Sequence, residues 1–251
     1  MGVIDVLNLH YQRAIGCIHN EDGIVGSIIG DALLAVFGAL GDPSDKSLRA
    51  LRAAFLVQEV AAELRANMGA LRMDILARKG ALTEGDEAVY EAVLLEVGVG
   101  IDGGDVFYGN IGSYDRMTTT VIGDNVNSAS RLEGLTRAYR VPIICSEFIK
   151  DEVQALDSGY RFLELDTVQV KGKTTGMRIF WPLKQSDIEP KLAAELDAFA
   201  SGIDSYYSGA WAEAAAAWGG LTLPFIELFM ERIDGLEAPA DWRGVWAMET
   251  K

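Results

Sequence analysis

The sequence predicts an α+β fold followed by a small helical segment. Short apolar runs bounded by glycine and aspartate indicate strands, and longer stretches with apolar residues at a helical period indicate helices. Several strands follow one another as hairpins, so strands and helices do not alternate strictly. Hydrophobic residues make up 49% of the 251 residues, which is enough to bury a substantial core.

The N-terminal part of the chain predicts a helix, a hairpin and two more helices. Apolar side chains recur near a helical period over residues 3–19. From Ile24 to Val36, Gly30-Asp31 splits the apolar runs, which predicts two strands joined by a tight turn. A helix start at Asp42–Asp45 predicts a helix over residues 44–67, and residues 70–92 are also expected to be helical, with a break near Lys79-Gly80.

The middle of the chain mixes strands with helices. Asp102–Asp105 and Gly109–Gly112 are predicted to be loops after strands, and Gly123-Asp124-Asn125 is predicted to cap a helix over residues 125–138. A further helix should begin at Ser146-Glu147. The remaining strands are expected over residues 96–101, 118–122, 141–145, 160–170 and 177–181.

The C-terminal part has a different composition. Residues 182–190 resemble a polar linker bounded by prolines, and residues 191–235 are helical in pattern and rich in alanine and aromatic residues. This pattern is similar to one helical hairpin of the tetratricopeptide kind, which cannot bury its own apolar face and should pack on the domain or on a partner. The tail, which contains Trp242 and Trp246, is expected to fold back.

Charge and cysteine content narrow the class of protein. The formal net charge of −15 repels nucleic acid, although a small nucleotide is still compatible with a few local cations and a metal. Cys17 and Cys145 lack metal-ligand spacing, so we expect buried free thiols in a reducing setting. Neither a signal peptide nor an uninterrupted apolar stretch of membrane-spanning length is visible, and we expect a cytoplasmic protein.

A first candidate for chemistry is Asp31, which follows a glycine at the predicted hairpin tip. A carboxylate at such a tip is well placed to bind a hard cation. The alternative is an ordinary turn aspartate that bonds its own backbone.

A second group of candidates could meet a nucleotide. Asn127 and Arg131 are four residues apart on a predicted helix and so project from the same face, where they are able to hold a ribose oxygen and a phosphate. Lys171 and Lys173 flank a glycine between two predicted strands, where lysines contact phosphates as point charges. The alternatives are an exposed helix face and a solvated turn.

Four motifs, in this order, resemble the catalytic domain of class III adenylyl and guanylyl cyclases. Ile28–Gly38 is similar to the family's second metal-site motif, and Gly109–Ser113 matches the same family. Thr120–Asp124, followed by Asn127 and Arg131, resembles its transition-state motif. Lys171–Lys173 resembles its late phosphate-contacting loop. The resemblance covers roughly residues 1–183, so we expect a cyclase domain over 1–183 and a linker, helical hairpin and tail over 184–251.

The resemblance implies a ferredoxin-like cyclase domain with a mixed, mostly antiparallel sheet and flanking helices. It implies a lyase that converts ATP, or as the less favoured substrate GTP, to a 3′,5′-cyclic nucleotide and pyrophosphate in signal transduction. Two aspartates of one subunit, the second being Asp31, would hold two Mg²⁺ or Mn²⁺ ions. Asn127 would orient the ribose, and Arg131 and Lys171 would meet phosphate charge from the opposite subunit. We therefore expect a homodimer, or a heterodimer with another cyclase chain.

Two features depart from the family pattern. The family's first metal aspartate precedes its first helix, and no such motif occurs before Asp31, since residues 3–19 already correspond to that helix. Ser27 stands where adenylyl cyclases usually have a lysine that reads the adenine edge. Thr120, which corresponds to the usual companion of that lysine, is compatible with ATP. The pair Ser27 and Thr120 leaves the choice between ATP and GTP open.

Two explanations fit the missing motif. The sequence is a fragment or its start is assigned too late, or it is a cyclase-like dimerisation or regulatory module that binds nucleotide without catalysis. Without the usual central strand, a sheet edge would be exposed. We expect negligible cyclase activity from this chain alone, because one carboxylate cannot easily hold two divalent ions. It could still lend Asn127 and Arg131 to a partner that has both aspartates.

Overall fold

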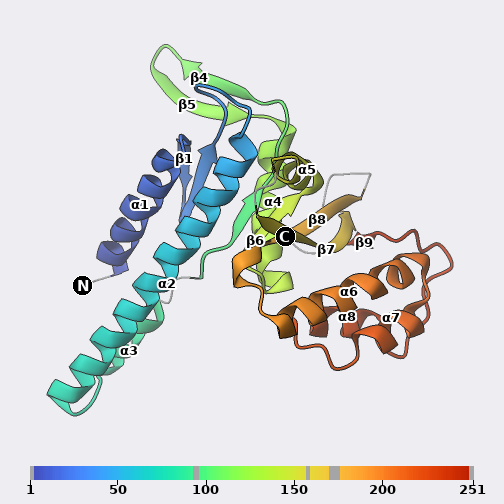
Figure 1. The fold of residues 1–251 in the computed structure, drawn as a ribbon. Helices are drawn as coiled ribbons and strands as arrows, with labels where there is room; N and C mark the ends of the chain where they lie inside the picture. The colour runs from blue at the N-terminus through green and yellow to red at the C-terminus, as the bar shows by residue number, and fades with distance from the viewer. Residues whose placement is uncertain (1–2, 93–95, 157–158, 170–175, 249–251) are drawn as a thin grey trace. The chain divides into compact units, whose positions relative to one another are not determined.

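A computed structural model of the protein describes residues 3–92, 96–156, 159–169 and 176–248 (Figure 1). The chain forms two compact units. The first contains residues 1–97 and 108–121, and the second contains residues 98–107 and 122–251. Both units combine helices with strands, which confirms the predicted α+β class. Within the described ranges, no helix has both the length and the apolar character needed to cross a bilayer.

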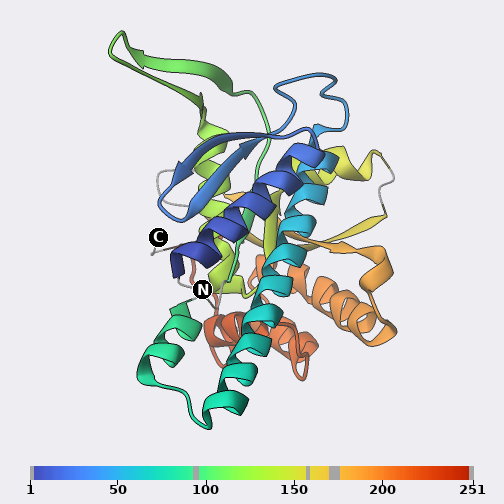
Figure 2. The ribbon, with the colours of Figure 1, turned by 90° about the vertical axis from the view of Figure 1, so that its left-hand side faces the viewer.

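The first unit is built from two hairpins and long helices. Its elements are α1 (Val3–Asn20), β1 (Ile24–Ile29), β2 (Ala32–Val36), α2 (Lys46–Lys79), α3 (Glu84–Ala92), β4 (Phe107–Ser113) and β5 (Arg116–Ile122). The strands β1 and β2 pair antiparallel, as predicted, and β4 and β5 form a second two-stranded sheet. Figures 1 and 2 both show α1 lying alongside α2.

Two predictions for this unit were wrong. Residues 44–67 and 70–92 do not divide near residue 68, since α2 runs unbroken through Met68, which packs with Val6 of α1 in one buried cluster. The predicted break at Gly80 is confirmed, because this residue caps α2 with a φ of +76°. Gly109–Gly112, predicted to be a loop, lies inside β4, where the Thr119 hydroxyl of β5 donates a hydrogen bond to Asn110 Oδ1 at 2.5 Å.

The second unit contains a mixed five-stranded sheet. Its strands, in spatial order, are β3 (Val99–Ile101), β6 (Ile143–Ser146), β8 (Met177–Lys184), β7 (Tyr160–Gln169) and β9 (Trp246–Ala247). The two outer pairs are parallel and the two inner pairs antiparallel. Helices α4 (Asp124–Tyr139) and α5 (Glu147–Gln154) accompany this sheet. Pro182, predicted to begin the linker, still belongs to β8, because β7 continues to pair with it there.

The C-terminal helices share one hydrophobic core with the sheet. These are α6 (Pro190–Ser208), α7 (Trp211–Trp218) and α8 (Ile226–Ile233), after a 3-10 turn over Gln185–Asp187. Phe199 stacks on Trp218 with ring centroids 4.9 Å apart, and both are fully buried together with Leu132 of α4 and Ile179 of β8. The predicted helical segment thus packs on the sheet, and the tail folds back to pair as β9 with β7.

The close approach of α6 to α7 depends on Gly202. A Cβ atom there would lie 2.5 Å from Trp218 Nε1, which donates a hydrogen bond to the Phe199 carbonyl at 3.0 Å. We predict that Gly202→Ala lowers the free energy of unfolding by about 1–3 kcal/mol, despite the better helix propensity of alanine.

The measurement is urea unfolding followed by circular dichroism. Gly134→Ala in α4 is the matched control, because a Cβ atom there meets nothing within 4 Å. This control should raise stability by up to about 1 kcal/mol. Equal stability of the two variants would contradict the packing argument.

Candidate functional site

Asp31 occupies the turn between β1 and β2. The strands are paired at Ile29 and Ala32, so Gly30 and Asp31 form a two-residue turn. Gly30 has a φ of +63°, which glycine adopts without strain, and its carbonyl accepts a hydrogen bond from the Tyr11 hydroxyl at 3.3 Å. The side chain of Asp31 is exposed at this tip, as the sequence predicted.

Ser27 and Thr120, the predicted base-contacting pair, both belong to the first unit. Ser27 lies on β1 next to a register shift and opposite Leu34, and its side chain is half-buried. Thr120 is half-buried on β5. Neither side chain carries a charge, so any preference between adenine and guanine here would have to come from hydrogen bonds and shape.

Asn127 and Arg131 lie one turn apart on α4, as predicted, in the second unit. The start of α4 is held closely by two glycines. A Cβ atom on Gly104 would lie 2.1 Å from Asn125 Nδ2, and one on Gly123 would lie 2.9 Å from Val106. Gly104 also has a φ of +140°, which favours glycine, and a side chain at either position would have to displace the side chain of Asn125 or Val106.

The guanidinium of Arg131 has no carboxylate partner among the described residues, although its side chain is half-buried. The other arginines of α4 and its end differ, because Arg137 pairs with Glu133 and Arg140 pairs with Glu227. A partly desolvated cation without a protein counter-ion is suited to bind an anion. Asn127 is exposed beside it.

Lys171 lies outside the described residues. Its sequence neighbours Gln169 and Gly176 are described, and they end β7 and precede β8 respectively. The two strands pair up to Val168 and Met177. The predicted phosphate contact of Lys171 therefore stays a prediction.

The ligands for a divalent cation are incomplete in the part of the chain that is described. An exposed aspartate oxygen suits Mg²⁺ or Mn²⁺, so Asp31 fits one ligand position. However, no group of three or more histidine, cysteine, aspartate or glutamate side chains gathers anywhere within the described ranges. Asp31 therefore fits one ligand position of a metal site.

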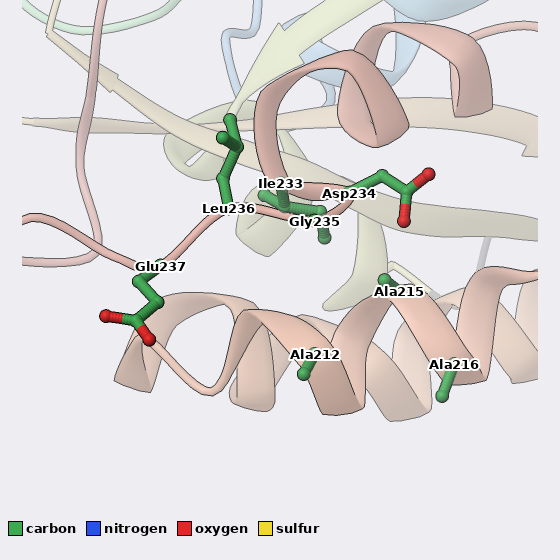
Figure 3. A pocket seen from close by; sticks show the side chains of 8 residues that line it. All are labelled: Ala212, Ala215, Ala216, Ile233, Asp234, Gly235, Leu236 and Glu237. Carbon is green, nitrogen blue, oxygen red and sulfur yellow. The ribbon is translucent and has the colours of Figure 1, made fainter.

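Other reactive or concave features lie apart from the predicted site residues. Burial raises the pKa of the Cys145 thiol, which makes it a poor nucleophile, and Cys17 is a half-buried free thiol. A cavity of about 480 Å³ lies between α7 and the segment after α8. Figure 3 shows its lining of Ala212, Ala215, Ala216 and Ile233–Glu237, which contains none of the predicted site residues.

The sequence analysis missed a buried polar cluster in the second unit. The Asp166 carboxylate accepts hydrogen bonds from the Tyr139 hydroxyl at 2.6 Å and from Arg232 at 2.7 Å. An aspartate within an apolar strand and an arginine between Phe229 and Ile233 were visible signals. Each is common alone, and only the fold shows that they form a pair.

Comparisons with known proteins identify the family and the fold of the chain. The family model described as adenylate and guanylate cyclase catalytic domain matches residues 1–184. The chain is 31% identical over 171 residues to an adenylate cyclase of Anabaena cylindrica, a match that covers 68% of this chain and 30% of that protein. It is 30% identical over 178 residues to the terminal-differentiation specific adenylate cyclase of Dictyostelium discoideum, covering 71% of this chain and 7% of that protein.

The chain thus spans less than a third of the length of either relative. Among solved structures, the guanylyl cyclase Cya2 aligns with a TM-score of 0.53 and 27% identity over 71% of this chain and 78% of its own. The adenylyl cyclase CyaB from P. aeruginosa aligns with a TM-score of 0.50 and 24% identity over 72% of this chain and 81% of its own. The predicted cyclase fold is therefore confirmed.

Proposed function

The chain belongs to the adenylate and guanylate cyclase catalytic domain family, and from this premise we propose that it binds a nucleoside triphosphate at a dimer interface. The reaction of the completed site is conversion of ATP, in preference to GTP, to 3′,5′-cyclic nucleotide and pyrophosphate. The observation that carries the proposal is the half-buried Arg131, which lacks a carboxylate partner among the described residues and shares a helix face with Asn127.

The proposed roles divide between two subunits. One subunit supplies Arg131 and Lys171, whose charges stabilise the negative charge that develops on the transferred phosphoryl group. Asn127 of the same subunit holds a ribose oxygen and so keeps the 3′-hydroxyl in line with the phosphorus. Ser27 and Thr120 are the residues of this chain proposed to meet the base.

Asp31 is the residue of this chain that would hold a divalent ion. When bound, Mg²⁺ or Mn²⁺ supplies Lewis-acid stabilisation of the triphosphate and activates the ribose hydroxyl. Because Asp31 fills only part of such a site, the completed site needs a further carboxylate ligand. We propose that this chain lends Asn127 and Arg131 to a partner that carries the full set of carboxylates.

A dimer is supported by exposed apolar side chains in the β4–β5 hairpin. Between residues 108 and 121, Tyr114 is fully exposed, Met117 is 59% exposed and Ile111 is 42% exposed. An exposed apolar patch of this kind is typical of a protein interface. We propose that this surface, called here the hairpin surface, contacts the second subunit in a homodimer or heterodimer.

A second candidate function is a non-catalytic module that dimerises and binds nucleotide. Two observations favour it. No group of three or more histidine, cysteine, aspartate or glutamate side chains gathers among the described residues, and Ser27 stands where the family usually has a base-reading lysine. The activity measurement described below separates the two candidates.

We predict that Arg131→Ala weakens the binding of a fluorescent ATP analogue with Mn²⁺ by roughly 10- to 100-fold, the value of one charge-assisted hydrogen bond. The matched control is Arg137→Ala on the same helix, because Arg137 is exposed and already pairs with Glu133. Titration of both variants and of the unchanged protein gives the dissociation constants. Equal weakening by the two substitutions would remove the basis of the proposal.

We predict that Met117→Lys on the hairpin surface weakens self-association by about tenfold or more, since it places a charge in an apolar interface. The control is Met73→Lys on α2, because Met73 is also 59% exposed. Sedimentation velocity over a range of concentrations measures both. A dimer that survives Met117→Lys as well as Met73→Lys would mean that subunits associate through another surface.

We predict that this chain alone forms negligible cyclic AMP or cyclic GMP with Mg²⁺ or Mn²⁺. Cyclic AMP should appear when it is fused, through a flexible linker, to a relative's cyclase domain that keeps its aspartates but lacks its own asparagine and arginine. Arg131→Ala in this chain should abolish the recovered activity. Cyclase activity of the chain alone would refute the proposal that its metal site is incomplete. A fusion that is folded but inactive would favour the non-catalytic module.

A further inference from the structure

The C-terminal helices reach two elements of the second unit. These elements are α4, which bears Asn127 and Arg131, and β7, which ends at Gln169. The contact is made in the interior of the second unit by Arg232 of α8. The side chain of Arg232 is only 5% exposed, and that of Asp166 on β7 is fully buried.

Arg232 joins the two elements directly. Its guanidinium donates a hydrogen bond to Asp166 Oδ2 at 2.7 Å and lies 3.5 Å from the Tyr139 hydroxyl at the end of α4. The Tyr139 hydroxyl donates to the same oxygen of Asp166 at 2.6 Å. The guanidinium therefore completes a three-residue cluster that ties α8 to α4 and β7.

Asp166 points inward because β7 is irregular at this place. The pairing of β7 with β8 shifts register between Glu164 and Asp166, and the consecutive residues Leu165 and Asp166 are both fully buried. A bulge of this kind turns an extra side chain to the interior. Burial raises the pKa of Asp166 above that of an exposed aspartate, while Arg232 and Tyr139 favour its charged form.

The C-terminal tail also contacts the cluster of Arg232, Asp166 and Tyr139, through Trp246. The Trp246 ring lies 4.2 Å from the guanidinium carbon of Arg232, and Trp246 pairs with Val168 of β7. The Met248 N–H donates a hydrogen bond to the Gln169 carbonyl at 3.2 Å. Val245 lies beside Gly176, since a Cβ atom added to Gly176 would be 3.0 Å from the Val245 side chain. The tail therefore contacts both described residues that flank residues 170–175.

The rotation of α4 about its own axis is set by the same core. Leu132, Leu135 and Tyr139 are buried along one face, and Arg131 precedes the first of them. If Tyr139 loses its partners, the end of this buried face loosens. Because Arg131 lies roughly 12 Å along the helix from Tyr139, a small rotation there moves the guanidinium of Arg131.

We propose that Arg232 is a positioning residue, which fixes the end of α4 and the end of β7 from the interior and so orients Asn127 and Arg131 toward the nucleotide. This inference rests on the proposed function, because the proposed roles of those two residues give the positioning its effect. It assigns the C-terminal helices and tail a part in the site, in addition to their packing on the sheet.

The test is Arg232→Met, with Arg161→Met as the matched control, because Arg161 also joins β7 to a C-terminal helix but pairs with the exposed Asp197. Hydrogen–deuterium exchange of the full chain should show faster exchange at the end of α4 and the end of β7 in Arg232→Met only. Trp246→Leu keeps the ion pair and serves as the second variant if Arg232→Met does not fold. It should speed exchange in the same two places to a lesser degree.

Nucleotide binding supplies a readout that a merely structural role would not move. Arg232→Met should weaken binding of the fluorescent ATP analogue with Mn²⁺ by about tenfold in the unchanged chain, and should have a clearly smaller effect in the Arg131→Ala variant. The destabilised Gly202→Ala variant should bind as tightly as the unchanged protein. Equal effects of Arg232→Met with and without Arg131, or unchanged exchange at α4 and β7, would overturn the inference.

The two proposals fail in different ways. If binding does not depend on Arg131 at all, the proposed function is wrong, and the exchange data still report whether Arg232 holds α4 and β7. If binding depends on Arg131 and is unaffected by both Arg232→Met and Trp246→Leu, the proposed function stands and the positioning role is refuted.

Discussion

A buried ion pair constrains the second unit more than any single apolar contact described above. Asp166 and Arg232 are removed from water, and each needs the other because an unpaired charge in the interior is strongly destabilising. Their partners Tyr139 and Trp246 are thereby drawn to the same place. Strand β7, helix α4, helix α8 and the tail are consequently arranged around one carboxylate.

This constraint matters because such pairs favour one arrangement over others, even where they add little stability. Apolar side chains such as Phe199, Phe225 and Phe229 are able to repack against many surfaces, whereas a buried carboxylate accepts only a few donor geometries. We infer that the aromatic cluster supplies most of the free energy that holds the C-terminal helices on the sheet. The ion pair selects the register and rotation of the elements it joins.

The division of the proposed site has a physical logic of its own. Asp31 lies at an exposed hairpin tip, where a carboxylate stays hydrated until a cation arrives. Arg131 is half-buried on a helix whose adjacent face is packed in the core, which keeps a cation without a described carboxylate partner in a defined direction. An exposed residue proposed to bind a metal and a half-buried residue proposed to bind phosphate would suit a site that forms when two subunits and a nucleotide meet.

The local sequence was sufficient to predict the structural features that depend on neighbouring residues in the chain. The turn at Gly30-Asp31, the helix that bears Asn127 and Arg131, and the break at Gly80 follow from backbone preferences and periodicity, and the structure confirms them. The ordered motifs also indicated the family. The prediction of a loop at Gly109–Gly112 was wrong, because this segment is extended by pairing with β5. The residues of the segment alone do not indicate that pairing.

Only the tertiary structure decided which distant residues meet. Asp166 and Arg232 are 66 residues apart in the chain, and nothing near either one specifies the other. The bulge in β7, the return of the tail as β9 and the unbroken course of α2 through Met68 likewise depend on partners from elsewhere in the fold. The sequence by itself determined elements such as the Gly30-Asp31 turn and the helix that bears Asn127 and Arg131, since those depend on short-range forces. Packing decided how the buried charges pair, because burial exists only once the chain has folded.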